Sequence, residues 1–138
     1  LGLALCEWAH DWLQQGFEHF DEHGSSSWDK LERYLRAALK HSMGDQKMCP
    51  ISAFYNDLGK LSQPMKDALV ALDDYELDWV EKVMVQGIES GDFHRQEDPR
   101  ALAALFIFSC KGALYYARLH GKDLFHQTMK QFEYLIKT

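Results

Sequence analysis

The chain of 138 residues has only three prolines, and none of its three cysteines forms a Cys-x-x-Cys pair. The low proline content excludes collagen-like and proline-rich proteins. The missing cysteine pairs exclude zinc ribbons, cysteine-bound iron–sulfur clusters and thioredoxin-like motifs. No cofactor is expected. Cys6, Cys49 and Cys110 lie far apart, and an odd, widely spaced set is typical of free thiols in a reducing compartment.

Long apolar runs are also missing. The longest run, Ala101–Cys110, ends at Lys111 and is about half of the ~20 residues that cross a bilayer, which predicts no membrane span. The opening residues carry no pattern of a secretory signal. The chain holds 21 Asp and Glu against 15 Lys and Arg, and this acidic balance argues against nucleic-acid binding by these residues themselves.

No alternating apolar pattern predicts a strand, and the pattern is helical throughout, which predicts one all-α domain. In each predicted helix the apolar residues repeat every three to four positions. Serine, aspartate and proline mark several helix starts, and glycines mark the ends; Gly24, for example, is expected to end the first helix. The predicted helices cover 1–22, 27–43, 50–60, 63–90, 99–120 and 122–137.

The helix predicted at 99–120 is apolar or small on nearly its whole circumference, which indicates burial on more than one side. A chain of this size covers only one side of such a helix with its own core. The other side predicts contact with a second copy across a two-fold axis, where Ser109, Gly112 and Ala113 would allow close approach. A fully internal helix is the competing interpretation.

Three stretches taken in order resemble the C-terminal regulatory domain of TetR-family transcriptional regulators. They are Cys49-Pro50-Ile51-Ser52 with Phe54 and Leu58, Ser62-Gln63-Pro64-Met65 with the helix that runs on to Phe93, and Asp98-Pro99-Arg100 through Gly121 to Leu135. The resemblance covers nearly the whole chain. It implies a cytoplasmic bacterial regulator, most often a repressor, whose residues 1–138 form a single ligand-binding and dimerisation domain.

The same resemblance implies that residues 1–22 connect this domain to a helix-turn-helix module that is absent from the sequence, so that operator DNA is a partner only through that module. It implies a homodimer, TetR-like in fold, in which the last two helices of each chain form a four-helix bundle. The residues expected at that interface are Leu105, Phe108, Ser109, Gly112, Tyr116, Thr128, Phe132 and Leu135.

The resemblance also implies a small-molecule pocket enclosed by the helices at 1–22, 27–43, 63–90 and 99–120. Aromatic walls with a few polar groups suit such a site, although ordinary core packing is the competing interpretation for each aromatic residue. The candidate ligand-binding residues are Trp8, Trp12, Tyr34, Phe54, Trp79 and Phe106.

Three other features of the sequence each have a functional explanation and a purely structural one. His19 and His23, one helical turn apart, could bind zinc, but a solvated helix end that favours histidine explains them without a metal. Cys49 precedes a helix start that could stabilise its thiolate, so oxidant or electrophile sensing is an alternative function. The carboxylates between 73 and 81 could favour a cationic ligand, or simply form a solvated helix face.

An enzyme is the runner-up class. A di-metal carboxylate site in a helical bundle needs two Glu-x-x-His motifs, and only Glu7-x-x-His10 is present. Nucleophile-elbow, P-loop and dinucleotide motifs are absent as well, so no enzymatic activity is expected. A third class is an adaptor dimer that binds neither ligand nor DNA. It predicts a filled core, whereas a ligand-binding regulator predicts a pocket of roughly a few hundred Å³.

Overall fold

The computed structural model describes residues 2–44, 54, 55, 57–95 and 97–137. This part of the chain forms five long α-helices and a short 3-10 turn, so the all-α prediction is confirmed. The elements are α1 (Gly2–His23), α2 (Ser27–Gly44), η1 (Leu58–Lys60), α4 (Gln63–Ser90), α5 (Pro99–His120) and α6 (Lys122–Lys137).

Five of the six predicted helices agree with the structure to within one residue at each end. The helix predicted at 50–60 is the exception. Residues 50–53 and 56 lie outside the described residues, Phe54 and Tyr55 are helical, and Leu58–Lys60 forms the 3-10 turn η1. The described part of this segment is therefore not one continuous α-helix, and the described residues hold five long helices.

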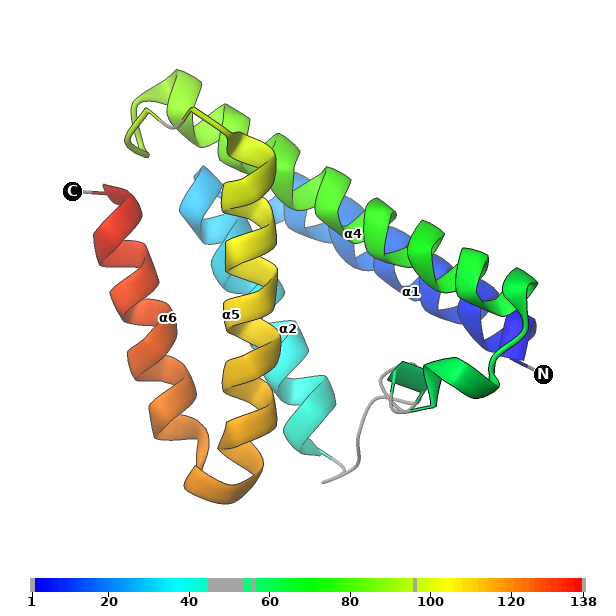
Figure 1. The fold of residues 1–138 in the computed structure, drawn as a ribbon. Helices are drawn as coiled ribbons and strands as arrows, with labels where there is room; N and C mark the ends of the chain where they lie inside the picture. The colour runs from blue at the N-terminus through cyan, green and yellow to red at the C-terminus, as the bar shows by residue number, and fades with distance from the viewer. Residues whose placement is uncertain (1, 45–53, 56, 96, 138) are drawn as a thin grey trace.

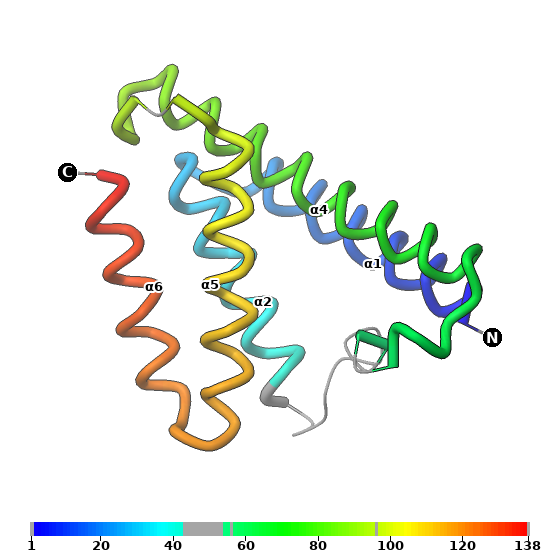
Figure 2. Tube along the Cα trace, viewed as in Figure 1, coloured from blue at the N-terminus to red at the C-terminus, as the bar shows by residue number. Residues whose placement is uncertain are grey.

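The helices pack as two pairs, which are joined by the contact between α4 and α5 and by α2. In Figure 1, α1 and α4 lie along each other, while α5 and α6 form an antiparallel hairpin. The trace in Figure 2 shows the long α4 running the length of α1 before the chain turns into α5. Both α2 and α4 contact three other helices: α2 packs against α1, α4 and α5, and α4 packs against α1, α2 and α5.

The helices α4 and α5 begin where their capping residues predict, and α4 also ends where its glycine predicts. The Ser62 side chain accepts a hydrogen bond from the Met65 amide at 3.3 Å, and Asp98 accepts one from the Ala101 amide at 3.0 Å. At the C-terminal end of α4, Gly91 has the left-handed backbone (φ 83°) that glycine adopts without strain. Local sequence therefore sets the bounds of α4 and the start of α5.

Gly24 ends α1 as expected, but without the left-handed backbone that is typical of glycine at a helix end. It lies directly after α1, but the glycines with positive φ in the described residues are Gly91 and Gly121. A Cβ at Gly24 would lie 2.4 Å from Lys30 Cγ and 2.7 Å from the Phe20 carbonyl oxygen. Close packing of α1 against α2, and not a left-handed backbone, is the reason for glycine at this corner.

Two apolar clusters hold the helices together. The main one fills the space around α2 and includes Leu31, Val83 and Phe106, while a smaller one lies between the N-terminal halves of α1 and α4 around Cys6 and Leu69. The N-terminal end of α1 is thus attached to α4 by its own small core. The pocket described below opens beside the junction of the two clusters, since Leu13 packs against both.

By length and composition alone, α5 would be long and apolar enough to cross a membrane. The sequence predicted no span because Lys111 interrupts the run Ala101–Cys110. The mean hydropathy of the helix is nevertheless high, because the apolar residues on both sides of Lys111 outweigh this one charge. Core helices of soluble proteins pass the same test, but only 28% of this apolar window is buried. Much of the apolar surface of α5 therefore lies on the outside of the chain.

Gly87, in α4, is the point where the chain folds back onto its own helix. The Phe93 amide donates a hydrogen bond to the Gly87 carbonyl at 3.0 Å, and a Cβ at Gly87 would lie 2.1 Å from the Phe93 ring. Helix propensity favours alanine by ~1 kcal/mol, but the overlap displaces a buried ring. We expect Gly87→Ala to lower the free energy of unfolding by about 1–3 kcal/mol in urea denaturation.

Gly59→Ala is the control for this prediction. No atom lies within 4 Å of a Cβ at Gly59, so its unfolding free energy should stay within about 0.5 kcal/mol of the parent. If Gly87→Ala were as stable as the parent protein, the contact with Phe93 would not constrain this turn.

Candidate functional site

A pocket of about 510 Å³ opens between α1, α2, α4 and α5. This volume lies in the range of small-molecule sites, and a plain adaptor with a filled core does not predict it. The lining is mainly apolar and rich in large rings. Seven of the lining residues are Phe, Trp or Tyr, namely Trp8, Trp12, Phe17, Phe20, Tyr34, Tyr55 and Tyr115.

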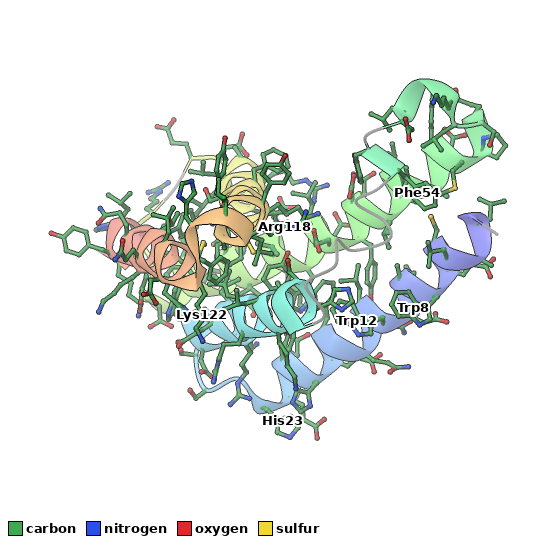
Figure 3. All side chains as sticks on the ribbon, turned by 90° about the horizontal axis from the view of Figure 1, so that it is seen from below. Trp8, Trp12, His23, Phe54, Arg118 and Lys122 are labelled. Carbon is green, nitrogen blue, oxygen red and sulfur yellow. The ribbon has the colours of Figure 1, made fainter. Side chains whose placement is uncertain are left out.

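The wall formed by α1 carries two tryptophans one helical turn apart. Trp8 and Trp12 line the pocket and are partly exposed, and the Trp12 ring packs against the His41 imidazole of α2 with 5.0 Å between centroids. Figure 3 shows Trp8 and Trp12 neighbouring each other along α1, with His23 farther along the same helix. His23 does not line the pocket, so the aromatic wall belongs to the middle of α1.

The six residues expected to bind ligand fall into two groups. Trp8, Trp12 and Tyr34 line the pocket, and the other three do not. Phe54 packs against the smaller core, while Trp79 and Phe106 are buried in the main core. The helical period places Trp79 and Phe106 on the inner side of their helices, where they contact aromatic rings of other helices and do not reach the cavity.

The buried position of Trp79 has a clear structural reason. Its ring stacks on Phe17 with 4.4 Å between centroids and 2° between planes, and its indole nitrogen donates to the Asp21 carboxylate at 3.2 Å. Phe17 itself lines the pocket. Trp79 therefore supports the pocket wall from behind.

The polar part of the pocket centres on an ion pair between α4 and α5. Lys111 Nζ lies 2.9 Å from the Glu76 carboxylate, whose side chain is only 12% exposed against 52% for Lys111. Burial lowers the pKa of Lys111, but Glu76 and then Asp73 raise it further, so the net pKa is above the ordinary value. The ammonium stays charged beside the pocket.

Two tyrosines complete this polar region. The Tyr55 hydroxyl donates a hydrogen bond to Asp73, and both burial and this carboxylate raise the pKa of Tyr55. Burial raises the pKa of Tyr34 well above its ordinary value, and Glu76 adds to the rise. Both hydroxyls therefore remain protonated and can donate to a carboxylate or orient a ligand.

Lys111 was not among the expected site residues, whereas Glu76 is one of the carboxylates between 73 and 81 for which a cationic ligand was one of two explanations. The signal that could have found Lys111 is its position as the charge that interrupts the apolar run of α5, since a lysine there needs a partner. For Tyr115, Phe20 and Tyr55 the sequence offers no comparable signal, because their patterns are those of ordinary apolar helix faces.

The remaining acidic residues of α4 face a different direction. Asp74, Asp78 and Glu81 surround Arg100, the second residue of α5, at 3.7, 2.6 and 3.3 Å. These carboxylates do not line the pocket. The acidic run is thus divided between an outer face that holds α5 to α4 and an inner face, Asp73 and Glu76, at the pocket.

Cys110 also lines the pocket and is almost fully buried. Burial, and then the Glu76 charge, raise its pKa to about 12, so the thiol stays protonated at neutral pH. Burial raises the pKa of Cys6 as well. Neither offers a reactive thiolate. Cys49, on which the sensing alternative depends, lies outside the described residues.

The histidines at the end of α1 form a pair without further ligands. The His19 and His23 rings lie 4.2 Å apart, and His23 Nδ1 lies 3.1 Å from the His19 carbonyl oxygen. In the part of the chain that the structure describes, no three His, Cys, Asp or Glu side chains are grouped as metal ligands.

Most of the expected interface residues lie on one apolar surface of α5 and α6, which we call the α5/α6 face. A shallow groove on it is lined by Leu105, Ser109, Thr128 and Leu135 among others, and Phe108 and Tyr116 are exposed nearby. Gly112 is exposed, with open space around it. Phe132 touches the groove but is buried against Phe106, with 5.3 Å between ring centroids.

Comparison with known proteins gave two matches. Residues 27–132 match the family model described as tetracyclin repressor-like, C-terminal domain. Among solved structures, the regulatory protein TetR from Rhodobacter sphaeroides superposes with a TM-score of 0.86 at 21% sequence identity, covering 98% of this chain and 74% of that one. At this identity the second match shows the fold alone. No curated protein matches the chain.

Proposed function

Because the chain belongs to the TetR family through the family's C-terminal regulatory domain, we propose that it binds a small-molecule effector in the pocket between α1, α2, α4 and α5. The family consists of transcriptional regulators and not of enzymes. The observation that carries the proposal is the aromatic-lined pocket of about 510 Å³ at the junction of four helices. In this proposal residues 1–138 form one ligand-binding and dimerisation domain of a cytoplasmic regulator.

The proposed mechanism uses α1 as the moving part. Trp8 and Trp12 of α1 form one wall of the pocket, so a bound effector touches this helix directly. An effector changes the position of α1 only if it binds one arrangement more tightly than the other, since equal affinity for both shifts nothing. A shift of α1 would then change DNA binding by the intact regulator, which we propose to be a repressor released by its effector.

The second part of the proposal is a homodimer through the α5/α6 face. Large apolar side chains are exposed along it, including Phe108, Tyr116 and Leu135. Exposed apolar surface of this kind marks an interaction site, and a second copy related by a two-fold axis covers the same patch on both chains. The groove between α5 and α6 would receive side chains of the partner.

A neutral aromatic probe tests whether the pocket is a binding site. N-phenyl-1-naphthylamine should bind with a rise in fluorescence, and Trp12→Ala should weaken its binding about tenfold, because one lost aromatic contact is worth ~1–1.5 kcal/mol. His23→Ala is the control, since His23 lies on the same helix outside the pocket. Equal affinity in the parent protein and in Trp12→Ala would contradict the proposed site.

A further inference from the structure

We propose that the pocket selects flat aromatic cations over neutral and anionic molecules of the same shape. This inference rests on the proposed effector site and adds the chemical class of the effector. It depends on which charges reach the pocket, which of them are already paired, and what the walls offer to a positive charge.

Counted over the described residues, the inner part of the pocket has one negative charge in excess. Asp73 and Glu76 line it from α4, and Lys111 lines it from α5. Lys111 is 2.9 Å from Glu76, and among the described residues no ion pair joins Asp73 to a cation. The partner of Asp73 is the Tyr55 hydroxyl, a neutral donor whose raised pKa keeps its proton in place. Two carboxylates and one ammonium therefore leave one charge for a ligand to balance.

The other charged groups around the pocket do not cancel this excess. Arg118 lines the pocket from α5, but it follows Lys111 by seven residues, about 10 Å along the helix axis, and is exposed. Arg100 is occupied by carboxylates on the outer face of α4. His19 and His41 are the two imidazoles in the lining, and His41 packs on the Trp12 ring.

The walls reinforce the preference for a positive charge. An aromatic face attracts a cation through its quadrupole, and the rings of Trp8 and Trp12 stand on the wall formed by α1. A flat cation between the rings would gain stacking and charge compensation together.

The two faces of α4 supply a matched pair of variants. Asp73 faces the pocket, while its neighbour Asp74 is exposed on the outer face beside Arg100 at 3.7 Å. Asp73→Asn and Asp74→Asn change the net charge of the protein equally, but only the first removes a charge from the pocket. Asparagine can still accept the hydrogen bond from Tyr55, so the wall keeps its contact.

The experiment compares three probes with the same ring system: 10-methylacridinium, acridine and acridine-9-carboxylate. Affinities are measured by titration calorimetry in 50 mM salt at pH 8, where an ordinary imidazole is neutral. We expect the cation to bind at least tenfold more tightly than acridine, and the carboxylate more weakly than acridine. Asp73→Asn should reduce the affinity for the cation five- to tenfold and leave that for acridine unchanged, whereas Asp74→Asn should change neither by more than twofold.

The possible failures are distinguishable. If all three probes bind equally, or the carboxylate binds most tightly, the charge preference is overturned while the pocket stands as a binding site. If Asp74→Asn lowers the affinity for the cation as much as Asp73→Asn does, the preference comes from the net charge of the protein and the inference is overturned. If no probe binds, the inference fails together with the proposal that the pocket receives aromatic ligands of this size.

Discussion

Replacing Phe106 by alanine is expected to lower the free energy of unfolding by about 3–5 kcal/mol, the usual cost of removing a buried phenylalanine side chain. Phe106 has no exposed surface, and its ring meets Tyr34 of α2 and Phe132 of α6 at centroid distances of 5.8 and 5.3 Å. It therefore connects three helices at once. The loss should appear as a lower midpoint of urea unfolding with an unchanged slope.

The same variant separates a core role from a ligand-binding role for Phe106. If Phe106 were mainly a pocket residue, alanine would change ligand affinity and leave stability nearly unchanged. The structure assigns it to the core, so a stability loss below about 1 kcal/mol would contradict this assignment. Because stability of a dimer depends on concentration, parent and variant must be compared at several equal protein concentrations.

The second large effect is expected two residues farther along the same helix. Phe108→Lys should raise the dissociation constant of the proposed dimer by at least 100-fold, equivalent to about 3 kcal/mol. The Phe108 side chain is 66% exposed on the isolated chain and lies on the α5/α6 face. In a two-fold interface the substitution would bury two ammonium groups, each without a partner, and such burial is costly. Analytical ultracentrifugation measures the effect directly.

Val70→Lys is the matched control for the dimer prediction. Val70 is also an exposed apolar residue, 59% exposed, but it lies on α4 away from the α5/α6 face. The control should remain dimeric. The Phe108→Lys protein should be a stably folded monomer, since Phe108 contributes little to the core of its own chain. A parent protein that is monomeric at 50 µM, or a Phe108→Lys protein that is still dimeric there, would exclude this interface.

Phe106 and Phe108 also illustrate how far a sequence pattern reaches. The pattern predicted that α5 is apolar on more than one side, and the two residues do lie on different sides. The pattern did not assign each side to the core or to the surface. Phe106 was expected to bind ligand and lies in the core, because α5 turns that face toward α2 and α6.

The acidic run of α4 is a second example. From the sequence, Asp73, Asp74 and Asp78 form one charged stretch with two possible explanations. In the structure the run is divided. Asp74 and Asp78 hold Arg100 on the outer face of α4, whereas Asp73 lines the pocket. Residues 73 and 74 differ by about 100° around the helix, so neighbours in sequence face different surroundings.

The sequence by itself determined where five of the six predicted helices run, because those signals are local. Capping at Ser62 and Asp98 and the glycine at Gly91 act within one turn of their own helix, so no distant contact is needed to interpret them. The ordered set of helices was also enough to indicate the family. Each helix boundary depends on residues at most a few positions apart, and the family follows from the order of these local signals along the chain.

Only the tertiary structure decided which aromatic side chains surround the pocket. Trp12, Trp79 and Phe106 all lie on apolar stripes of their helices, yet only Trp12 lines the cavity. The choice depends on where α1, α4 and α5 cross and on the side from which each approaches α2. Crossing positions result from the packing of all the helices together, and no local pattern in one helix contains them.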